Sequence, residues 1–203
     1  LMYLWPAFGG NNTPYGKGLA WLLAGTPPRY AVIDTGTNSI KFHVGERAAD
    51  GTWRAGVDRA EVTRLGEGLE QSGEISDEAV ARAADAIAGM VAEARAHGAL
   101  AITAVGTAGL RIAANRDAVI EAIAARTGVR IEVVSGEEES RLAYLAVKAG
   151  VGLAEGSLAV FDTGGGSTQL TFGHGDTVDD RFSVNVGAVR YTERFGLSDV
   201  VSE

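Results

Sequence analysis

Two short segments of the sequence carry residue types that suit a phosphate chain. In each, an aspartate ends an apolar run, and a stretch of glycine and hydroxyl residues follows it. Backbone N–H groups in such a stretch can converge on phosphate oxygens, because no large side chain blocks the approach, and the carboxylates could hold Mg²⁺ through its waters. The alternative is a pair of ordinary turns with aspartate as the turn former. The metal candidates are Asp34 and Asp162, and the phosphate-binding candidates are Thr35, Gly36, Thr37, Asn38, Ser39, Gly164, Gly165, Gly166, Ser167 and Thr168.

These two segments repeat one another at a separation of 128 residues. Residues 31–45 and 159–173 share seven of fifteen residues, including Asp-Thr-Gly and the serine three positions later. A duplicated strand–turn–strand unit predicts two similar lobes that face one another across a cleft. The two aspartates and their turns are therefore expected on opposite sides of one cleft.

Two further places in the sequence could supply catalytic groups. Glu137, Glu138 and Glu139 open an expected helix, where acids are favoured by the helix dipole, yet hydrolysis also needs a base that orients and deprotonates water. Arg111 follows the turn at 106–109 after a buried strand and could bind phosphate oxygens. The alternative for this arginine is a surface side chain that caps a carbonyl.

The elements that would position these residues follow an α/β order. Strands are expected at 30–34, 40–45, 53–64, 100–105, 129–134 and 158–162, and helices that begin at Ser76 or Asp77, at Asn115 as N-cap, and at Glu137. The order is three strands and then alternating helices and strands, which predicts an antiparallel start followed by parallel additions through helical crossovers.

Composition narrows the class of protein. The chain has 203 residues, 18 basic and 26 acidic side chains, a net charge of −8 and no cysteine. This charge argues against broad electrostatic binding to nucleic acid or to an anionic membrane, and no stretch approaches the ~20 apolar residues of a membrane span. The absence of cysteine fits a reducing compartment, so we expect a cytoplasmic protein.

Five motifs in order resemble one known family. They are D-T-G-T-N-S at 34–39, R-L-G-E-G-L at 64–69, G-T-A-G-L-R-I-A-A-N at 106–115, S-G-E-E-E-S-R-L-A-Y at 135–144 and D-T-G-G-G-S-T at 162–168. Together they resemble the Ppx/GppA family of exopolyphosphatases and guanosine pentaphosphate phosphohydrolases over roughly residues 30–196. The resemblance implies an actin-like (ribonuclease-H-like) α/β fold, Mg²⁺ dependence and attack of water on a terminal phosphoanhydride of polyphosphate or guanosine pentaphosphate.

The resemblance also assigns roles to single residues. It implies that Glu139 is the catalytic glutamate, that Asp34 and Asp162 are the metal-linked aspartates, and that Arg111 is the catalytic arginine of the G-T-x-x-L-R loop. Gln169 departs from the pattern, because the family usually has glutamate there, and a neutral amide puts a metal or base role at this position in doubt. G-G-x-S-T-Q is typical of apyrase-type nucleoside phosphohydrolases, which remain the second hypothesis. A non-catalytic module that binds phosphate or a guanosine polyphosphate is the third.

The motifs suggest a division of the chain. Residues 1–28 show no clear period and are taken as a leader of unknown role, residues 29–156 as a first actin-like lobe, and residues 157–203 as the start of a second. A full second lobe would need about 100 residues or more, so we expect most of it to lie beyond this sequence. A homodimer stays open as an alternative.

Overall fold

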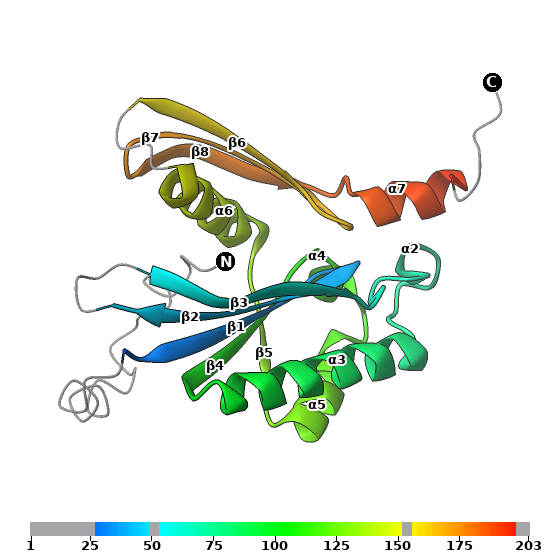
Figure 1. Ribbon diagram of the computed structural model, residues 1–203. Helices are drawn as coiled ribbons and strands as arrows, with labels where there is room; N and C mark the ends of the chain where they lie inside the picture. Colours follow the sequence, from blue (N-terminus) through cyan, green and yellow to red (C-terminus); the bar gives the residue numbers. More distant parts are fainter. Residues whose placement is uncertain (1–26, 49–52, 152–155, 198–203) are drawn as a thin grey trace.

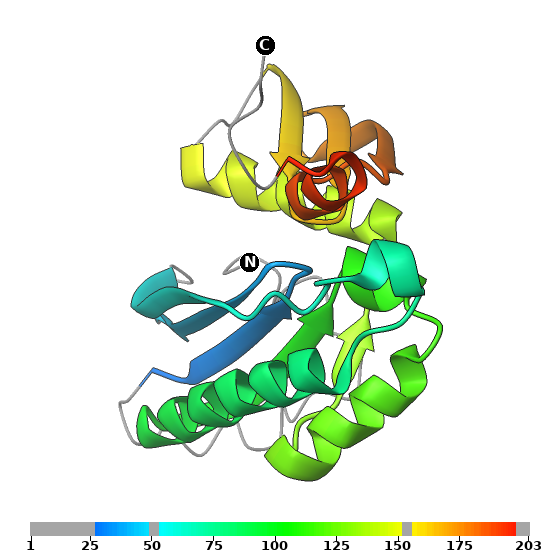
Figure 2. The same cartoon turned by 90° about the vertical axis from the view of Figure 1, so that its right-hand side faces the viewer.

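The computed structural model describes residues 27–48, 53–151 and 156–197. The expected leader at 1–28 therefore lies almost wholly outside the described residues. The five-stranded and the three-stranded sheet lie one above the other in Figures 1 and 2, with helix α6 (Gly136–Val151) between them and helices α3 (Asp77–Ala96) and α5 (Arg116–Thr127) beneath the lower sheet. The first half comprises the lower sheet, its loops, α3, α5 and two short helices, α2 (Leu69–Ser72) and α4 (Ala108–Ile112). The second half comprises the upper sheet, α6 and α7 (Ala188–Phe195).

The first sheet has five strands in the order β3-β2-β1-β4-β5. β1 pairs antiparallel with β2 and β2 with β3, whereas β4 is parallel to β1 and β5 is parallel to β4. This confirms the expected antiparallel start and parallel additions. The strands are β1 (Arg29–Thr35), β2 (Ser39–Arg47), β3 (Trp53–Val62), β4 (Ala99–Gly106) and β5 (Ile131–Val133).

The core of the first half lies between this sheet and two helices, α3 (Asp77–Ala96) and α5 (Arg116–Thr127). The buried side chains of α3 recur every three or four residues, so one face of the helix covers the sheet. The helix begins where it was expected, and the Ser76 hydroxyl caps it by accepting a hydrogen bond from the Ala79 N–H.

Asn115 occupies the expected N-cap position of α5, and its carbonyl accepts the first hydrogen bond of the helix, from the Val119 N–H at 3.1 Å. Its side chain makes no cap hydrogen bond. Its Oδ1 instead accepts from the Ile75 N–H at 3.0 Å, and its Nδ2 donates to the Ile75 carbonyl at 2.8 Å. The amide thus satisfies both backbone groups of a residue 40 positions away and joins the start of α5 to the segment before α3. Two short helices that the sequence did not predict lie nearby, α2 (Leu69–Ser72) and α4 (Ala108–Ile112).

The second sheet is antiparallel, in the order β6-β7-β8. It comprises β6 (Ser157–Thr163), β7 (Thr168–His174) and β8 (Thr177–Val184), and α7 (Ala188–Phe195) follows it. Helix α6 (Gly136–Val151), which we grouped by sequence with the first lobe, contacts all three of these strands and lies between the two sheets (Figure 1). β8 and α7 are findings of the structure that the sequence did not predict.

The internal repeat is confirmed by backbone geometry. In the first copy the Gly36 N–H donates to the Ser39 carbonyl at 3.1 Å, and in the second the Gly164 N–H donates to the Ser167 carbonyl at 2.9 Å. Both copies also carry a register shift at the same place, at 44/45 and at 172/173. A β-bulge is a defined backbone feature, so its recurrence 128 residues later marks a true structural duplication.

The two copies differ in what covers them. Ile33 in the first sheet is fully buried in the core that this sheet forms with α3 and α5, whereas its equivalent Phe161 is 66% exposed. Phe161, Phe172 and Phe182 contact one another in a row across the three strands of the second sheet. The second sheet therefore presents to solvent the face that helices cover in the first.

Candidate active site

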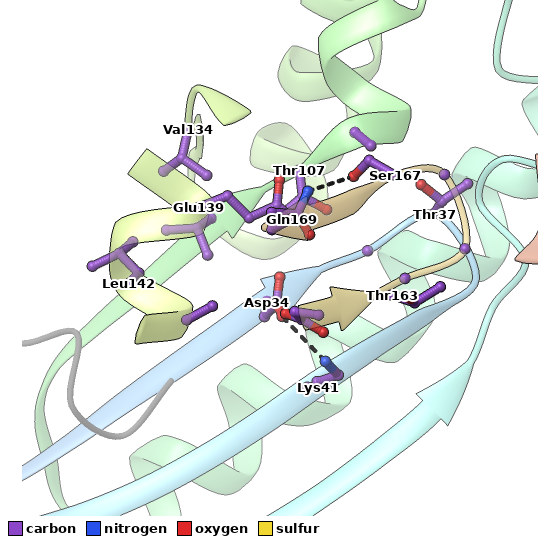
Figure 3. A pocket seen from close by; sticks show the side chains of 18 of the residues that line it. Asp34, Thr37, Lys41, Thr107, Val134, Glu139, Leu142, Thr163, Ser167 and Gln169 are labelled. Atoms are coloured by element: carbon purple, nitrogen blue, oxygen red, sulfur yellow. Dashed lines mark hydrogen bonds and ion pairs between the residues drawn. The ribbon is translucent and has the colours of Figure 1, made fainter. Parts of the chain in front are cut away.

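A cavity of about 350 Å³ lies between the two halves. It is bounded by the two repeated turns, by β1 and β6, and by one face of α6 (Figure 3). Both predicted metal aspartates and the predicted catalytic glutamate line it, so the expected juxtaposition of the two segments is observed. The charged side chains among its lining residues are Asp34, Lys41, Glu139 and Asp162.

Eight of the ten phosphate-binding candidates line this cavity: Gly36, Thr37, Asn38, Ser39, Gly164, Gly165, Gly166 and Ser167. The other two are placed elsewhere. Thr35 is 1% exposed and is the last residue of β1. Thr168 lies on the far side of its turn, where its hydroxyl donates to the Val186 carbonyl at 2.6 Å. These two side chains therefore do not reach the cavity.

The two turns lie directly against one another. A Cβ atom built on Gly165 would come within 3.1 Å of the Asn38 Cβ, and one built on Gly166 within 2.6 Å of the Thr37 Oγ1. In the described structure, the hydrogen bonds that shape the turns use the first glycine amide of each and leave those of Thr37, Asn38, Gly165 and Gly166 unengaged. Backbone donors from both halves thus border one space, as a phosphate-binding site requires.

Only one of the three consecutive glutamates reaches the cavity. Glu138 is held by Arg141 through two hydrogen bonds of 2.9 and 2.7 Å, which lower its pKa. The Glu137 Oε2 lies 4.0 Å from the Arg181 Nη2. Glu139, one residue further round α6, lines the cavity with its side chain 18% exposed. Of the three glutamates, Glu139 is therefore the one placed to act as a base in the cavity, whereas Glu137 and Glu138 interact with arginines instead.

Arg111 contacts Glu139 and does not line the cavity itself. Its Nη1 donates to the Glu139 Oε2 at 2.6 Å and to the Val134 carbonyl at 3.1 Å. Burial raises the pKa of Glu139, and the nearby guanidinium opposes this without cancelling it. The carbonyl-capping prediction is met by the Val134 contact, whereas the binding of phosphate oxygens by Arg111 stays a prediction.

Asp34 is the most deeply buried acid of the site. Burial raises its pKa to about 6, the charges of Glu139 and Asp162 add to this, and Lys41 opposes it. Its Oδ2 lies 3.9 Å from the Lys41 Nζ, and its Oδ1 has no hydrogen-bond partner. A buried carboxylate oxygen without a partner destabilises the folded state. A cation or a hydrogen-bond donor bound at the Asp34 Oδ1 would therefore stabilise the protein.

This burial predicts a pH-dependent stability. The folded state of Asp34 binds its proton more tightly than the unfolded state does, so the free energy of unfolding falls as pH rises from about 4 to about 6. The loss approaches about 3 kcal/mol, from a pKa raised from 3.8 to about 6. Urea unfolding in EDTA at several pH values tests this. Asp34→Asn should remove this pH dependence of the free energy of unfolding, and Asp117→Asn, at an exposed position of α5, should keep it. Identical dependence on pH in the two variants would contradict the prediction.

Lys41 is a site residue that the sequence analysis missed. It pairs with Asp34 across β1 and β2, and Gln169 pairs in the same way with Asp162 across β6 and β7. Lys41 and Gln169 are separated by 128 residues and so occupy equivalent places in the repeat. Extending the repeat comparison from the turns to the second strand of each copy could have found Lys41.

Gln169 is buried, with 2% of its surface exposed, and borders the cavity. Its Nε2 donates to the Ser167 Oγ at 2.8 Å and to the Ser183 Oγ at 3.0 Å. Two hydroxyl groups therefore fix the orientation of the side chain that departs from the expected glutamate.

The donor set can be tested against the expected Mg²⁺. Carboxylate oxygens are the ligands that this ion prefers, and Asp34 offers an unpartnered one. Within residues 27–48, 53–151 and 156–197, no three acidic, histidine or cysteine side chains are grouped closely enough to hold a metal directly. The residues present therefore fit an ion that keeps most of its waters.

Within the described residues, no helix has the length and apolar character needed to cross a membrane.

Sequence comparison identifies relatives of this chain. The model of the Ppx/GppA phosphatase family matches residues 54–203. The chain is 34% identical over 179 residues to exopolyphosphatase 2 of Mycobacterium tuberculosis, covering 84% of this chain and 56% of that protein. It is 36% identical over 172 residues to the guanosine-5'-triphosphate,3'-diphosphate pyrophosphatase of Vibrio parahaemolyticus, covering 85% and 34%. The chain thus spans between a third and just over half of these relatives.

Solved structures agree with this relationship. An exopolyphosphatase from Cytophaga hutchinsonii superposes with a TM-score of 0.78 at 27% identity, over 82% of this chain and 53% of that one. The Ppx/GppA family member from Aquifex aeolicus gives a TM-score of 0.72 at 29% identity, over 84% and 55%. The expected α/β, actin-like fold is confirmed. With its ordered motifs placed around one cavity, the chain belongs to the Ppx/GppA phosphatase family.

Proposed function

We propose that this chain contributes the catalytic site of a hydrolase that releases terminal phosphate from inorganic polyphosphate or guanosine pentaphosphate. The observation that carries the proposal is the cavity in which two phosphate-binding turns and the Glu139 carboxylate meet. The names of the relatives point to the same two substrates. Because the chain spans only part of those relatives, the proposal concerns the protein to which this segment contributes.

Glu139 is the proposed water-activating base. Its side chain reaches the cavity from the first turn of α6, so its carboxylate oxygens can accept a hydrogen bond and then a proton from a water placed beside the terminal phosphorus. A carboxylate whose pKa is raised by burial is a stronger base than a solvated one. Arg111 would hold the carboxylate in place through its 2.6 Å contact.

The turns and Lys41 are the proposed substrate-binding groups. The amides of Thr37, Asn38, Gly165 and Gly166 would donate to phosphate oxygens, and the Lys41 ammonium would add a positive charge. These donors would stabilise the negative charge that phosphoryl oxygens gain during the reaction.

Asp34 and Asp162 are the proposed residues for Mg²⁺. The charged lining consists of three carboxylates and one lysine, which would repel a polyanion unless cations accompany it. A bound Mg²⁺ would offset phosphate charge and polarise the bond to phosphorus. The two aspartates would hold the waters of this ion from opposite sides of the cavity.

Metal dependence can be measured without turnover. Adding MgCl₂ to EDTA-treated protein is expected to raise the melting temperature, because a ligand that binds only the folded state stabilises it. The rise should be lost in Asp34→Asn and kept in Asp117→Asn. An equal rise in all three proteins would contradict a role for Asp34.

A substrate panel tests the proposed activity. Phosphate release from polyphosphate, guanosine pentaphosphate, ATP and ADP should be measured with the full chain and with MgCl₂ present. Release from the first two alone supports the proposal. The second candidate is an apyrase-like nucleotide hydrolase, which Gln169 favours, and faster release from ATP and ADP would establish it. Tight binding of guanosine pentaphosphate without any release would identify a binding module and overturn the proposal.

A further inference from the structure

A pair of contacts joins the two halves on the side of the cavity where both turns meet. The Arg190 Nε in α7 lies 2.9 Å from the Glu70 Oε2 in α2. The Glu193 Oε1, one turn further along α7, accepts a hydrogen bond from the Gly68 N–H at 3.0 Å. The arginine and glutamate side chains of the ion pair are 16% and 28% exposed, so this pair is better shielded than a typical surface ion pair. We call these two contacts the clasp.

One end of the clasp is fixed to the first turn. The R-L-G-E-G-L motif, which the proposed catalytic roles do not use, runs from β3 into α2. The Arg64 N–H donates to the Asn38 carbonyl at 2.8 Å, and the Gly66 N–H donates to the Thr37 carbonyl at 2.8 Å. Glu70 therefore sits at the end of a segment whose backbone is bonded to the phosphate-binding turn at 35–39.

The other end of the clasp is fixed to the second turn. The first N–H groups of α7 donate to that turn: Ala188 to the Gly164 carbonyl at 3.0 Å, and Val189 to the Gly165 carbonyl at 2.9 Å. The Arg190 N–H donates to the Gly165 carbonyl as well, at 3.1 Å. The helix that carries the clasp arginine is thus bonded directly to the phosphate-binding turn at 164–168.

We propose that the clasp sets the spacing of the two phosphate-binding turns. Arg190, Glu70 and Glu193 are then positioning residues, because they act through the backbone of the turns and do not line the cavity. The turns come from different halves, so a substrate held by both would depend on this spacing. This inference rests on the proposed function only for its effect on turnover; the spacing itself can be measured separately.

A distance measurement tests the clasp without substrate. The chain has no cysteine, so nitroxide labels at Glu78→Cys on α3 and Asp180→Cys on β8, both exposed, report the separation of the halves. Arg190→Gln is expected to broaden the distance distribution and shift it to longer values. Exchanging the charges with Glu70→Arg and Arg190→Glu should restore the narrow distribution. Arg194→Gln, on the same helix and without a partner in the first half, is the control and should leave it unchanged.

Kinetics supply a second readout. If the full chain hydrolyses a substrate of the panel, Arg190→Gln should lower kcat about tenfold, since small displacements of bound groups have effects of this size or larger. Glu193→Ala should act in the same direction, and Glu193→Gln, which keeps an acceptor for the Gly68 N–H, should not. An unchanged distance distribution in Arg190→Gln would overturn the inference even if the substrate panel succeeds. Conversely, a chain without turnover whose label distance still responds to Arg190→Gln would overturn the proposed function and retain the clasp.

Discussion

Replacing Glu139 with glutamine is expected to lower phosphate release by about 10²- to 10⁴-fold, the range that a general base contributes. Glutamine keeps the size of the side chain and an oxygen that can contact Arg111, but it cannot accept the proton of the attacking water. KM should change little, because the turns and Lys41 remain. The measurement is steady-state phosphate release at saturating substrate and MgCl₂.

The neighbouring glutamate provides a matched control. Glu138→Gln removes a charge of the same kind from the same helical turn, but Glu138 pairs with Arg141 and does not line the cavity. It should retain nearly full activity. Equal losses in the two variants would show that charge at the start of α6, and not a base at Glu139, supports turnover.

The second large effect is expected from Gly187→Ala. The residue adopts φ −150°, which suits alanine, so the effect is purely one of space. The added Cβ would lie 2.5 Å from the carbonyl carbon of Gly165 and 2.6 Å from that of Gly166. These are backbone atoms of the second turn and cannot rotate away, so α7 or the turn must shift. We expect a loss of about 1–3 kcal/mol in the free energy of unfolding, as for other overpacked sites, together with at least a tenfold loss of phosphate release.

A glycine in open space separates this clash from a general effect of alanine. Gly89 lies within α3, and a Cβ there would meet no atom within 4 Å. Gly89→Ala should therefore stabilise the chain by about 0.5–1 kcal/mol through helix propensity and leave activity unchanged. Urea unfolding and phosphate release of both variants give the comparison. A Gly187→Ala protein as stable and active as the parent would show that the second turn tolerates displacement.

Much of the site could be predicted because the repeated turns are determined by residues that are close together in the sequence. Asp34 and Asp162 each lie one residue before the end of a strand that leads into a turn of small residues, and the two similar sequences fold into turns with the same internal hydrogen bond. The apolar period of α3 and its Ser76 cap are local signals of the same kind. These features depend on residues within a few positions of one another.

The parts that were missed depend on distant contacts. The residue pattern of α6 predicts an amphipathic helix, but it does not indicate that the helix packs on the second sheet and not on the first. Asn115 has the residue type and place of an N-cap, but its amide is engaged by Ile75, which only tertiary packing brings near. The isolated sequence also gave no sign that Arg111 and Glu139, 28 positions apart, would form an ion pair.

That ion pair joins two parts of the molecule that pack separately. Arg111 belongs to α4 in the first half, whereas Glu139 belongs to the helix that packs on the second sheet. A rotation of one half against the other that separates these two side chains would withdraw the guanidinium charge from the carboxylate. The proton affinity of Glu139 therefore depends on the relative orientation of the two halves. Because the Arg111 guanidinium lowers the pKa of this carboxyl group, Glu139 would be a stronger base in a molecule whose halves had separated.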